Sequence, residues 1–403
     1  MSEAREPEVL TTAEGASAEP EVLTTAEGAS AEPDLLYSEV EEDLRASVRD
    51  LLTDQASPAA VLKRAETAEP YDLKLWRTLA ADLGAAGLAV PEELGGHGAS
   101  AREVAVVLEE LGRSVAPVPF LGSVVLATSA LLGADTTDAV VGELLPRLAA
   151  GDLIGALAVP LTTAPDAEFP SAVTVNADGS LSGRVGKVAD ASAAELLVVP
   201  AIGPDGPGLY AVETASSGVS VTELVSLDLT RRVADVVLDN APARVVASGT
   251  HAPAALTYAL TTAAGLLASE QLGITEWALT ETAEYLKTRY QFGRPVGSFQ
   301  SLKHRLADLY TDLVNARAAA RYAADALATG SEDVPVAVAV AQASGAPIAV
   351  HAVEEAVQLH GGIGMTWEHP AHLYLKRAKA DELALGTPAR HRARLAQLVD
   401  LPA

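Results

Sequence analysis

The sequence TRYQFGRPVGSFQ occupies positions 288–300, and QLHGGIG occupies positions 358–364. Both stretches lie among long alanine- and leucine-rich segments of helical character. A guanidinium such as that of Arg289 can donate two parallel hydrogen bonds to phosphate oxygens. A glycine pair such as Gly361 and Gly362 lets a ligand approach the backbone closely. A cation, an amide and a glycine pair at helix ends therefore predict a site for a phosphate-bearing cofactor.

Composition excludes several classes of function. The 403 residues suggest two or three domains, and the formal net charge of −26 argues against nucleic acid or an anionic membrane as a partner. The chain has no cysteine, which excludes disulfides and thiolate sites, and we predict no metal site. Two uncharged stretches, 115–134 and 334–353, are interrupted by polar residues or proline and are predicted to be buried soluble structure. The N-terminus lacks the pattern of a signal peptide, so we expect a cytoplasmic protein.

The pattern of hydrophobic and turn-forming residues changes along the chain. Residues 6–18 (EPEVLTTAEGASA) repeat at 19–31, and an acidic unit rich in alanine and threonine cannot bury a core. A helical pattern follows, then short apolar runs separated by turn signals, and then long helical segments with a break near Gly386-Thr387-Pro388. The expected domains are a disordered tail (1–35), an N-terminal helical domain (36–150), a middle antiparallel β domain (151–248) and a C-terminal four-helix bundle (249–403), an α+β fold.

With these motifs in this order, the chain resembles the acyl-CoA dehydrogenase family over roughly residues 36–400. The resemblance rests on the arginine–glutamine element, on the glycine pair and on the loop PEELGG at 91–96. The run GMTWEHP at 364–370 is similar to forms common in actinobacterial members. The resemblance implies the family's fold, a CoA thioester substrate, and FAD held without a covalent bond at a subunit interface.

The resemblance also assigns residues to the cofactor. It implies that Arg289 and Gln300, with Phe292 and Gly293 in the same element, meet the pyrophosphate. It places Gln358, Gly361 and Gly362 against the adenosine part of a flavin from the neighbouring subunit, and it makes Thr387 the last contact. Without it, Arg289 would be interpreted as a cation at a helix end and the glycine pair as a helix C-cap.

The expected catalytic base is missing. The family's reaction removes an α proton from a thioester with a glutamate that normally precedes a Gly-Thr pair, and here that position is Leu385. Some members place the base 26 residues before the arginine, at Ala263 here. Glu270 remains as a candidate, two turns further along that helix and displaced by about 10 Å. We expect burial to raise its pKa; the alternative is a structural glutamate that forms hydrogen bonds between helices.

The middle domain also departs from the family pattern. A turn and a strand that meet the flavin ring in other members correspond to about 159–162 and 187–190. Ala189 replaces the expected hydroxyl, and Lys187 replaces the expected aromatic residue. This subunit's own contact with the ring is therefore expected to be weak.

This pattern resembles the base-lacking subunits of heterotetrameric members, which include enzymes of steroid side-chain degradation. We therefore predict an FAD-binding subunit that acts in α,β-dehydrogenation of an acyl-CoA thioester with a second catalytic subunit, in lipid or steroid catabolism. Three alternatives remain open. They are an autonomous homotetramer with a displaced base, a structural partner that has lost flavin, and the same scaffold used for other chemistry on a carrier-bound acyl group.

Overall fold

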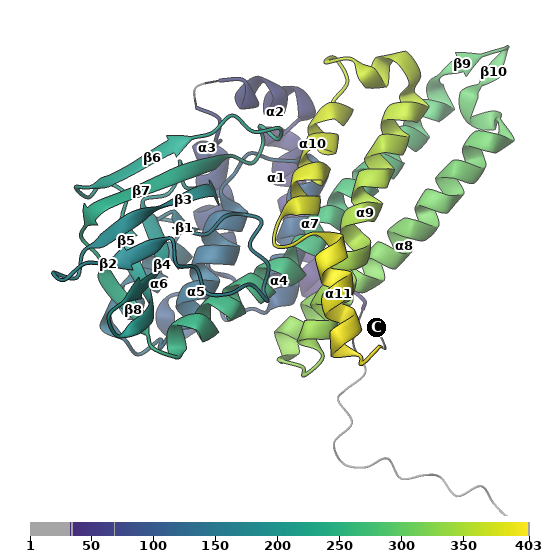
Figure 1. Cartoon of the computed structure of the whole chain (residues 1–403). Helices are drawn as coiled ribbons and strands as arrows, with labels where there is room; N and C mark the ends of the chain where they lie inside the picture. The colour runs from purple at the N-terminus through teal and green to yellow at the C-terminus, as the bar shows by residue number, and fades with distance from the viewer. Residues whose placement is uncertain (1–32, 34, 68, 402–403) are drawn as a thin grey trace, which may run out of the picture. The chain divides into compact units, whose positions relative to one another are not determined.

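The computed structural model describes residues 33, 35–67 and 69–401, so the 13-residue repeat of the predicted tail lies outside the described residues. The chain passes through helices, then a β sheet, then helices again, as Figure 1 shows. This order confirms the predicted α+β class, with a helical N-terminal region, a central sheet and a helical C-terminal region.

Six α-helices, with short 3-10 and π-helical turns between some of them, form the N-terminal region. They are α1 (Glu39–Gln55), α2 (Pro58–Ala65), α3 (Leu73–Arg77), α4 (Ala101–Ser114), α5 (Thr128–Leu132) and α6 (Ala139–Ala149). The start of α1 is fixed by a capping box, because the Ser38 hydroxyl accepts the Glu41 N–H and the Glu41 carboxylate accepts the Ser38 N–H. The uncharged stretch 115–134 is mostly buried, as predicted.

One sheet of eight strands forms the central region. Its strands are β1 (Gly155–Leu157), β2 (Val173–Val175), β3 (Leu181–Ala189), β4 (Leu196–Gly203), β5 (Gly206–Glu213), β6 (Val219–Glu223), β7 (Val233–Ala241) and β8 (Arg244–Ser248). The strand order is β6-β7-β3-β2-β4-β5-β8, with β1 also paired to β4. The prediction of an antiparallel sheet is wrong at two pairings, because β1 and β2 both run parallel to β4. β1 pairs with the beginning of β4, at Leu196, and β2 pairs with its end, at Ile202.

The C-terminal region is built on long helices. These are α7 (His251–Thr288), α8 (Gln300–Thr329), α9 (Val334–His360), α10 (Ala371–Leu383) and α11 (Pro388–Leu398). A small hairpin of β9 (Tyr290–Gln291) and β10 (Arg294–Pro295) joins α7 to α8. The predicted break in the last helix is confirmed. It occurs because Leu385 and Gly386 have positive φ, and α11 then starts with Pro388 behind the N-cap Thr387.

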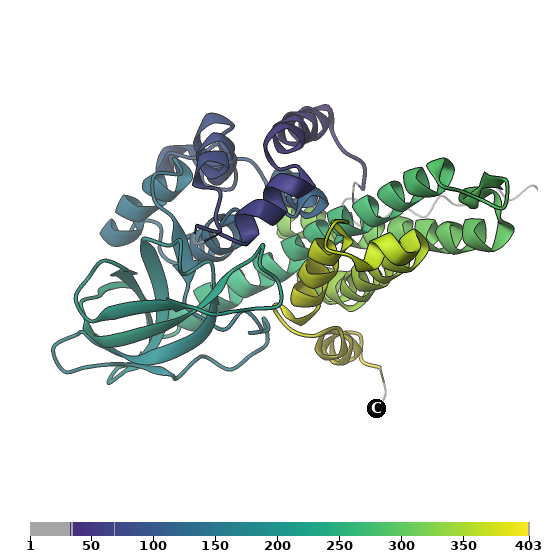
Figure 2. The same cartoon turned by 90° about the horizontal axis from the view of Figure 1, so that it is seen from above.

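Helix α7 passes through the centre of the fold and packs against α4, α8 and α9, as Figures 1 and 2 show. Its crossing with α4 depends on two glycines. A Cβ on Gly273 would lie 1.9 Å from the Glu109 carbonyl oxygen, and a Cβ on Gly112 would lie 2.1 Å from the Glu270 carbonyl oxygen. Only glycine permits this approach, which brings the backbone of Glu270 against α4.

Two helical segments are long and apolar enough to cross a membrane by length and composition alone, His251–Thr288 and Val334–Met365. In the fold, 72% and 61% of their most apolar windows are buried. Their apolar surface is therefore used largely in the protein core, as in the core helices of a soluble protein.

Candidate functional site

A pocket of about 540 Å³ lies where the end of α7, the start of α8 and the end of α9 meet. Four of the residues that the sequence assigns to a cofactor line it together: Arg289, Gln358, Gly361 and Gly362. Its other lining residues are Tyr285, Gln291, Val296, Leu302, Arg305, Leu359, His360 and Ile363. The two motifs that are 69 positions apart, counted from Arg289 to Gln358, therefore form one site.

Arg289 lines this pocket and is the C-cap residue of α7, where its backbone is held by two hydrogen bonds. The N–H of Arg289 donates to the Tyr285 carbonyl at 2.9 Å, and its own carbonyl accepts from Val296 N–H at 2.7 Å. Its side chain is exposed, and among the described residues the guanidinium has no hydrogen bond or ion pair. The neighbouring Arg305, in contrast, donates to both carboxylate oxygens of Glu355. Arg289 is thus the lining arginine whose donors are available to a ligand.

The glycine pair ends α9. Gly361 has φ +62° and its N–H donates to the Gln358 carbonyl, so the helix-cap interpretation holds for this residue. A Cβ on Gly361 or on Gly362 would meet no atom within 4 Å. The backbone here faces open space, which leaves room for a ligand against the main chain.

Three predicted contacts lie elsewhere. Phe292 and Gly293, with φ +53° and +74°, are the two central residues of the β9–β10 hairpin turn. Positive φ at both positions is the geometry of a type I′ turn, which explains the glycine without any ligand. Gln300, the first residue of α8, is exposed, and none of these three residues lines the pocket.

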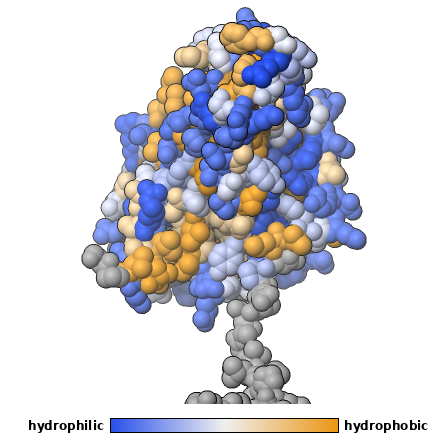
Figure 3. All heavy atoms as spheres, turned by 90° about the vertical axis from the view of Figure 1, so that its right-hand side faces the viewer, coloured by the Kyte–Doolittle hydropathy of each residue, from blue (hydrophilic) through white to orange (hydrophobic). Residues whose placement is uncertain are grey.

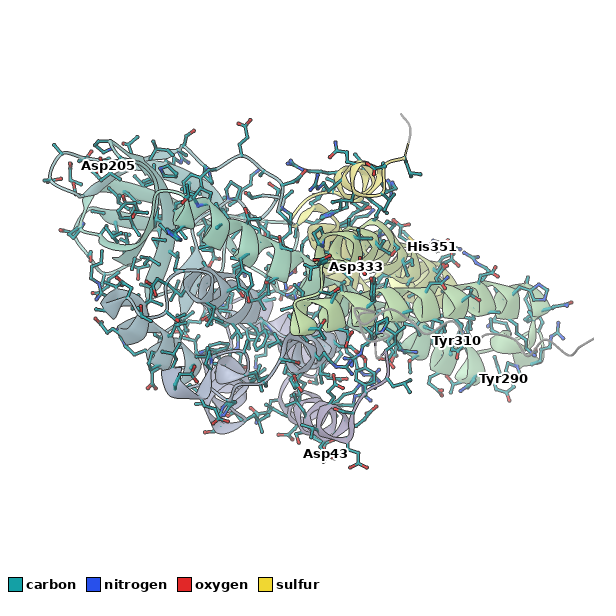
Figure 4. The ribbon with its side chains drawn as sticks, turned by 90° about the horizontal axis from the view of Figure 1, so that it is seen from below. Asp43, Asp205, Tyr290, Tyr310, Asp333 and His351 are labelled. Atoms are coloured by element: carbon teal, nitrogen blue, oxygen red, sulfur yellow. The ribbon has the colours of Figure 1, made fainter. Side chains whose placement is uncertain are left out.

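Figures 3 and 4 show the surroundings of this hairpin. In Figure 3, apolar atoms stand beside strongly hydrophilic ones at the upper end of the face that carries α8. Phe292 is 91% exposed there and makes an edge-on contact with the Phe299 ring. Figure 4 places Tyr290 at the far end of the helices and Tyr310 on the same side, and both are exposed. An exposed apolar tip of this kind is a candidate contact with another chain.

The remaining predicted contact, Thr387, is not part of the 540 Å³ pocket. Its hydroxyl caps α11 by accepting the Arg390 N–H at 3.3 Å. The segment before it is attached to the sheet region, because Leu385 N–H donates to the Leu161 carbonyl at 2.8 Å. Within one chain, Thr387 therefore lies outside the 540 Å³ pocket, which we call the arginine–glutamine pocket after Arg289 and Gln358.

Leu385 occupies the position where the base is expected. Its side chain is fully buried in the main hydrophobic core, and its backbone has φ +54°. The Leu385 carbonyl accepts a hydrogen bond from the His391 ring at 3.0 Å. Both its backbone groups are thus engaged in joining α10 and α11 to the neighbouring structure.

Glu270 lies in a buried charge network. Arg231 donates to it through Nη2, and Arg377 donates through Nη1 at 2.6 Å. Burial alone would raise the pKa of Glu270, but the charges of the two arginines and the hydrogen bonds that they donate outweigh it, so its pKa is lowered. The expected rise in pKa is therefore wrong, because it considered burial without partners. A carboxylate held in this way is a weak proton acceptor.

The network joins three parts of the fold. Arg377 of α10 also donates to Asp228 at 2.7 Å and to the Thr230 hydroxyl at 2.7 Å, both in the segment between β6 and β7. Arg231 donates to Asp381 of α10. Three carboxylates thus face two guanidinium groups. Burial and the charge of Glu270 raise the pKa of Asp381 well above its usual value.

The sequence did not indicate the network as a unit, since its members lie up to 153 positions apart, from Asp228 to Asp381. The local signal was a group of charged residues, Asp228, Arg231 and Arg232, in the otherwise uncharged stretch 224–234.

The two segments expected to face a flavin ring do lie together. Pro160 bridges to Val188, and Leu161 N–H donates to the Lys187 carbonyl at 3.0 Å. Lys187 is exposed with φ +57°, at a register shift in β3. A second pocket of about 530 Å³ lies beside Leu161 and Lys187 and is mostly apolar. It reaches Leu383 of α10 on its other side.

Comparison with known proteins agrees with these features. Residues 38–152 match the family described as acyl-CoA dehydrogenase, N-terminal domain, and residues 254–399 match acyl-CoA dehydrogenase, C-terminal domain. The chain is 39% identical to acyl-CoA dehydrogenase IpdE2 of Mycolicibacterium smegmatis over 89% of this chain and 98% of that protein.

Among solved structures, the ChsE4-ChsE5 complex of Mycobacterium tuberculosis contains a similar chain, with a TM-score of 0.79 and 32% identity. The match covers 92% of this chain and 100% of that one. A variant of the Tcur3481-Tcur3483 steroid ACAD gives a TM-score of 0.79 and 33% identity, over 90% of this chain and 98% of that one.

Proposed function

Because the chain belongs to the acyl-CoA dehydrogenase family of oxidoreductases, which act on CH–CH groups, we propose that it is an FAD-binding subunit without a base of its own. In this proposal it takes part in α,β-dehydrogenation of an acyl-CoA thioester, together with a second, catalytic subunit in an α2β2 assembly. The observation that carries the proposal is Leu385, a buried leucine at the position of the base, while the arginine–glutamine pocket remains open.

The residues of the pocket fit FAD. Arg289 has free donors for the pyrophosphate, and Gly361 and Gly362 leave space against the backbone, where Gln358 lines the same wall. When bound, FAD supplies the hydride acceptor of the reaction. The chain's own residues would hold the nucleotide part and orient it, with Gln300 and Thr387 as contacts to be tested.

Two chains are proposed because the site is divided within one. Thr387 and the 530 Å³ pocket beside Leu161 and Lys187 lie outside the arginine–glutamine pocket, so a flavin that uses both kinds of contact needs a neighbouring subunit. Two similar structures each contain two named proteins, ChsE4-ChsE5 and Tcur3481-Tcur3483, and they support a heteromer. Because the second of these is a steroid ACAD, a bulky lipid or steroid CoA thioester is proposed as the substrate. The proposed location is the cytoplasm.

The test is co-expression with a second family member that carries the glutamate, followed by flavin stoichiometry and acyl-CoA turnover. We expect a yellow complex that turns over substrate, and an inactive chain when it is purified alone. Turnover by the isolated chain would remove the need for a partner. A colourless complex would instead favour a structural subunit that has lost flavin.

A matched pair of variants tests the pocket itself. Arg289→Ala removes charged hydrogen bonds worth about 1.5–3 kcal/mol, so FAD affinity should fall about 10- to 150-fold. Arg147→Ala is the control, an exposed arginine of α6 outside the pocket. Equal FAD affinity in the two variants would contradict the assignment of Arg289.

A further inference from the structure

Three side chains outside the proposed flavin contacts lie together: Glu281 of α7, His360 at the end of α9, and His369 just before α10. One ligand atom from each lies within 4.8 Å of the others. His360 is buried, His369 is half-buried and Glu281 is exposed. Two imidazoles and a carboxylate form a donor set that suits zinc and similar divalent cations.

The tautomer of His360 follows from its hydrogen bond. Its Nδ1 lies 2.7 Å from the Ala356 carbonyl oxygen, which can only accept, so Nδ1 carries the proton. The lone pair is then on Nε2, which is buried and has no hydrogen-bond partner among the described residues. A histidine that donates one N–H to a backbone carbonyl and presents its other nitrogen is the usual arrangement of a metal ligand.

The ring of His360 is held in place from both sides. Tyr285 stacks on it with centroids 4.4 Å apart, and the His369 ring lies 4.1 Å away. The backbone of His360 is also fixed, since the Tyr285 hydroxyl donates to its carbonyl at 3.3 Å. The free Nε2 therefore keeps one direction, which a ligand atom requires.

His369 is half-buried, and its ring lies beside that of His360. Its Nδ1 accepts the Ala371 N–H at 3.2 Å, a long bond that a cation on the same lone pair would replace.

Glu281 supplies the negative charge and is exposed. Its carboxylate has no hydrogen bond or ion pair among the described residues. It also lines a pocket of about 360 Å³ between α1, α4, α7 and α10. Donor atoms around a tetrahedral zinc ion lie about 3.4 Å apart, from bond lengths near 2.1 Å. An exposed glutamate can close the remaining gap by changing rotamer.

We propose that Glu281, His360 and His369 form a binding site for Zn²⁺, with one coordination position left for water. Three protein ligands and one open position are typical of accessible zinc sites. The sequence predicts no metal here, because the two histidines and the glutamate follow no ligand spacing and lie on three separate segments. None of the three residues is a proposed flavin contact, but His360 lines the same pocket, so zinc binding is tested in flavin-free protein.

The experiment is a calorimetric titration of the chelator-treated full-length chain with Zn²⁺. We expect about one Zn²⁺ per chain, and at least a tenfold loss of affinity in His369→Ala and in Glu281→Gln, since even outer-shell changes cost 10- to 100-fold. His351→Ala is the matched control, because His351 is an exposed histidine on α9, as Figure 4 shows. Its zinc affinity should equal that of the unmodified chain.

Two results would overturn the site. One is the absence of zinc binding by the unmodified chain, and the other is unchanged affinity in both ligand variants. Glu281→Gln keeps the test decisive if His369→Ala fails to fold, because Glu281 is exposed and packs into no core. Bound Co²⁺ should also give the visible absorption of tetrahedral coordination in flavin-free protein. Flavin content is measured separately, so failure of this site leaves the proposed function intact.

Discussion

Replacement of Glu270 by glutamine separates an anchoring role from a catalytic one. The carboxylate accepts from two buried arginines, Arg231 and Arg377, and removal of one partner from a buried ion pair costs about 3–5 kcal/mol. For a chain of 403 residues the entropy of unfolding is roughly 0.85 kcal/mol/K. The melting temperature of Glu270→Gln should therefore fall by about 4–6 °C.

Part of this cost depends on pH. The charge of Glu270 is the second largest cause of the raised pKa of Asp381, after burial. Without that charge Asp381 loses its proton more easily and partly restores the balance around the arginines. The destabilisation in Glu270→Gln should therefore be larger at acidic pH and smaller as pH rises. The double variant with Asp381→Asn lacks this compensation, and should cost about 0.5–3 kcal/mol more than the sum of the single changes.

Circular dichroism melts from pH 5 to 9, with acyl-CoA turnover of the assembled enzyme, provide the assay. The control is Glu284→Gln, an exposed glutamate of α7 that pairs with Lys287 at the surface, where such pairs contribute less than about 1 kcal/mol. An unchanged melting temperature with lost turnover would refute the anchoring role and restore Glu270 as the base.

Three further changes test the fold. Gly273→Ala should destabilise the protein by about 1–3 kcal/mol or more in urea unfolding, since its Cβ would lie 1.9 Å from a carbonyl oxygen of α4. The control Gly142→Ala in α6 places its Cβ where no atom lies within 4 Å, and it should stabilise the protein by about 1 kcal/mol. Equal effects of the two changes would contradict the close crossing of α7 and α4. Asp381→Asn should lower the stability less than Glu270→Gln does. Because the pKa of Asp381 is raised in the fold, the stability that it adds is present below its unfolded pKa near 3.8 and is lost as pH rises. Melts in which Asp381→Asn is the more destabilised variant would contradict this. Burial alone would raise the pKa of Glu41, but hydrogen bonds from Arg102, Ser38 and Arg321 lower it from 4.5 to about 2. The stability that the ionised Glu41 adds to the fold is therefore present above pH 4.5 and is lost as pH falls toward 2. In acid titrations, the difference in stability between the unmodified chain and Glu41→Gln should narrow over that window.

Local signals in the sequence were enough for the order of elements and for the break after α10. Glycine with positive φ and proline at the first helical position act within a few residues, so Gly386 and Pro388 can be interpreted without a structure. Four of the eight predicted cofactor contacts, Arg289, Gln358, Gly361 and Gly362, line one pocket, and their contact with a cofactor stays a prediction. The position of Gln300 and the separation of Thr387 were not predictable, because both depend on how helices pack.

Electrostatics was the least predictable part. From the sequence, Glu270 lies in an apolar stretch, and burial in such a stretch raises the pKa of a carboxyl. The fold reverses the sign by bringing Arg231 from 39 positions away and Arg377 from 107 positions away. The phenylalanine–glycine pair at 292–293 forms the turn of a hairpin in the fold, and its predicted contact with a cofactor stays a prediction.

The same charge network supports the proposal that a second chain, and not this one, supplies the catalytic base. A general base needs a lone pair that faces substrate and a pKa near the working pH. In this chain two arginines hold Glu270 and lower its pKa, burial and the charge of Glu270 raise the pKa of Asp381, and the expected position holds the buried Leu385. Through Arg231, Glu270 of α7 and Asp381 of α10 are both joined to the segment between β6 and β7. A base would have to come from outside this network, and a second subunit with the usual glutamate meets that requirement without disturbing the buried arginines.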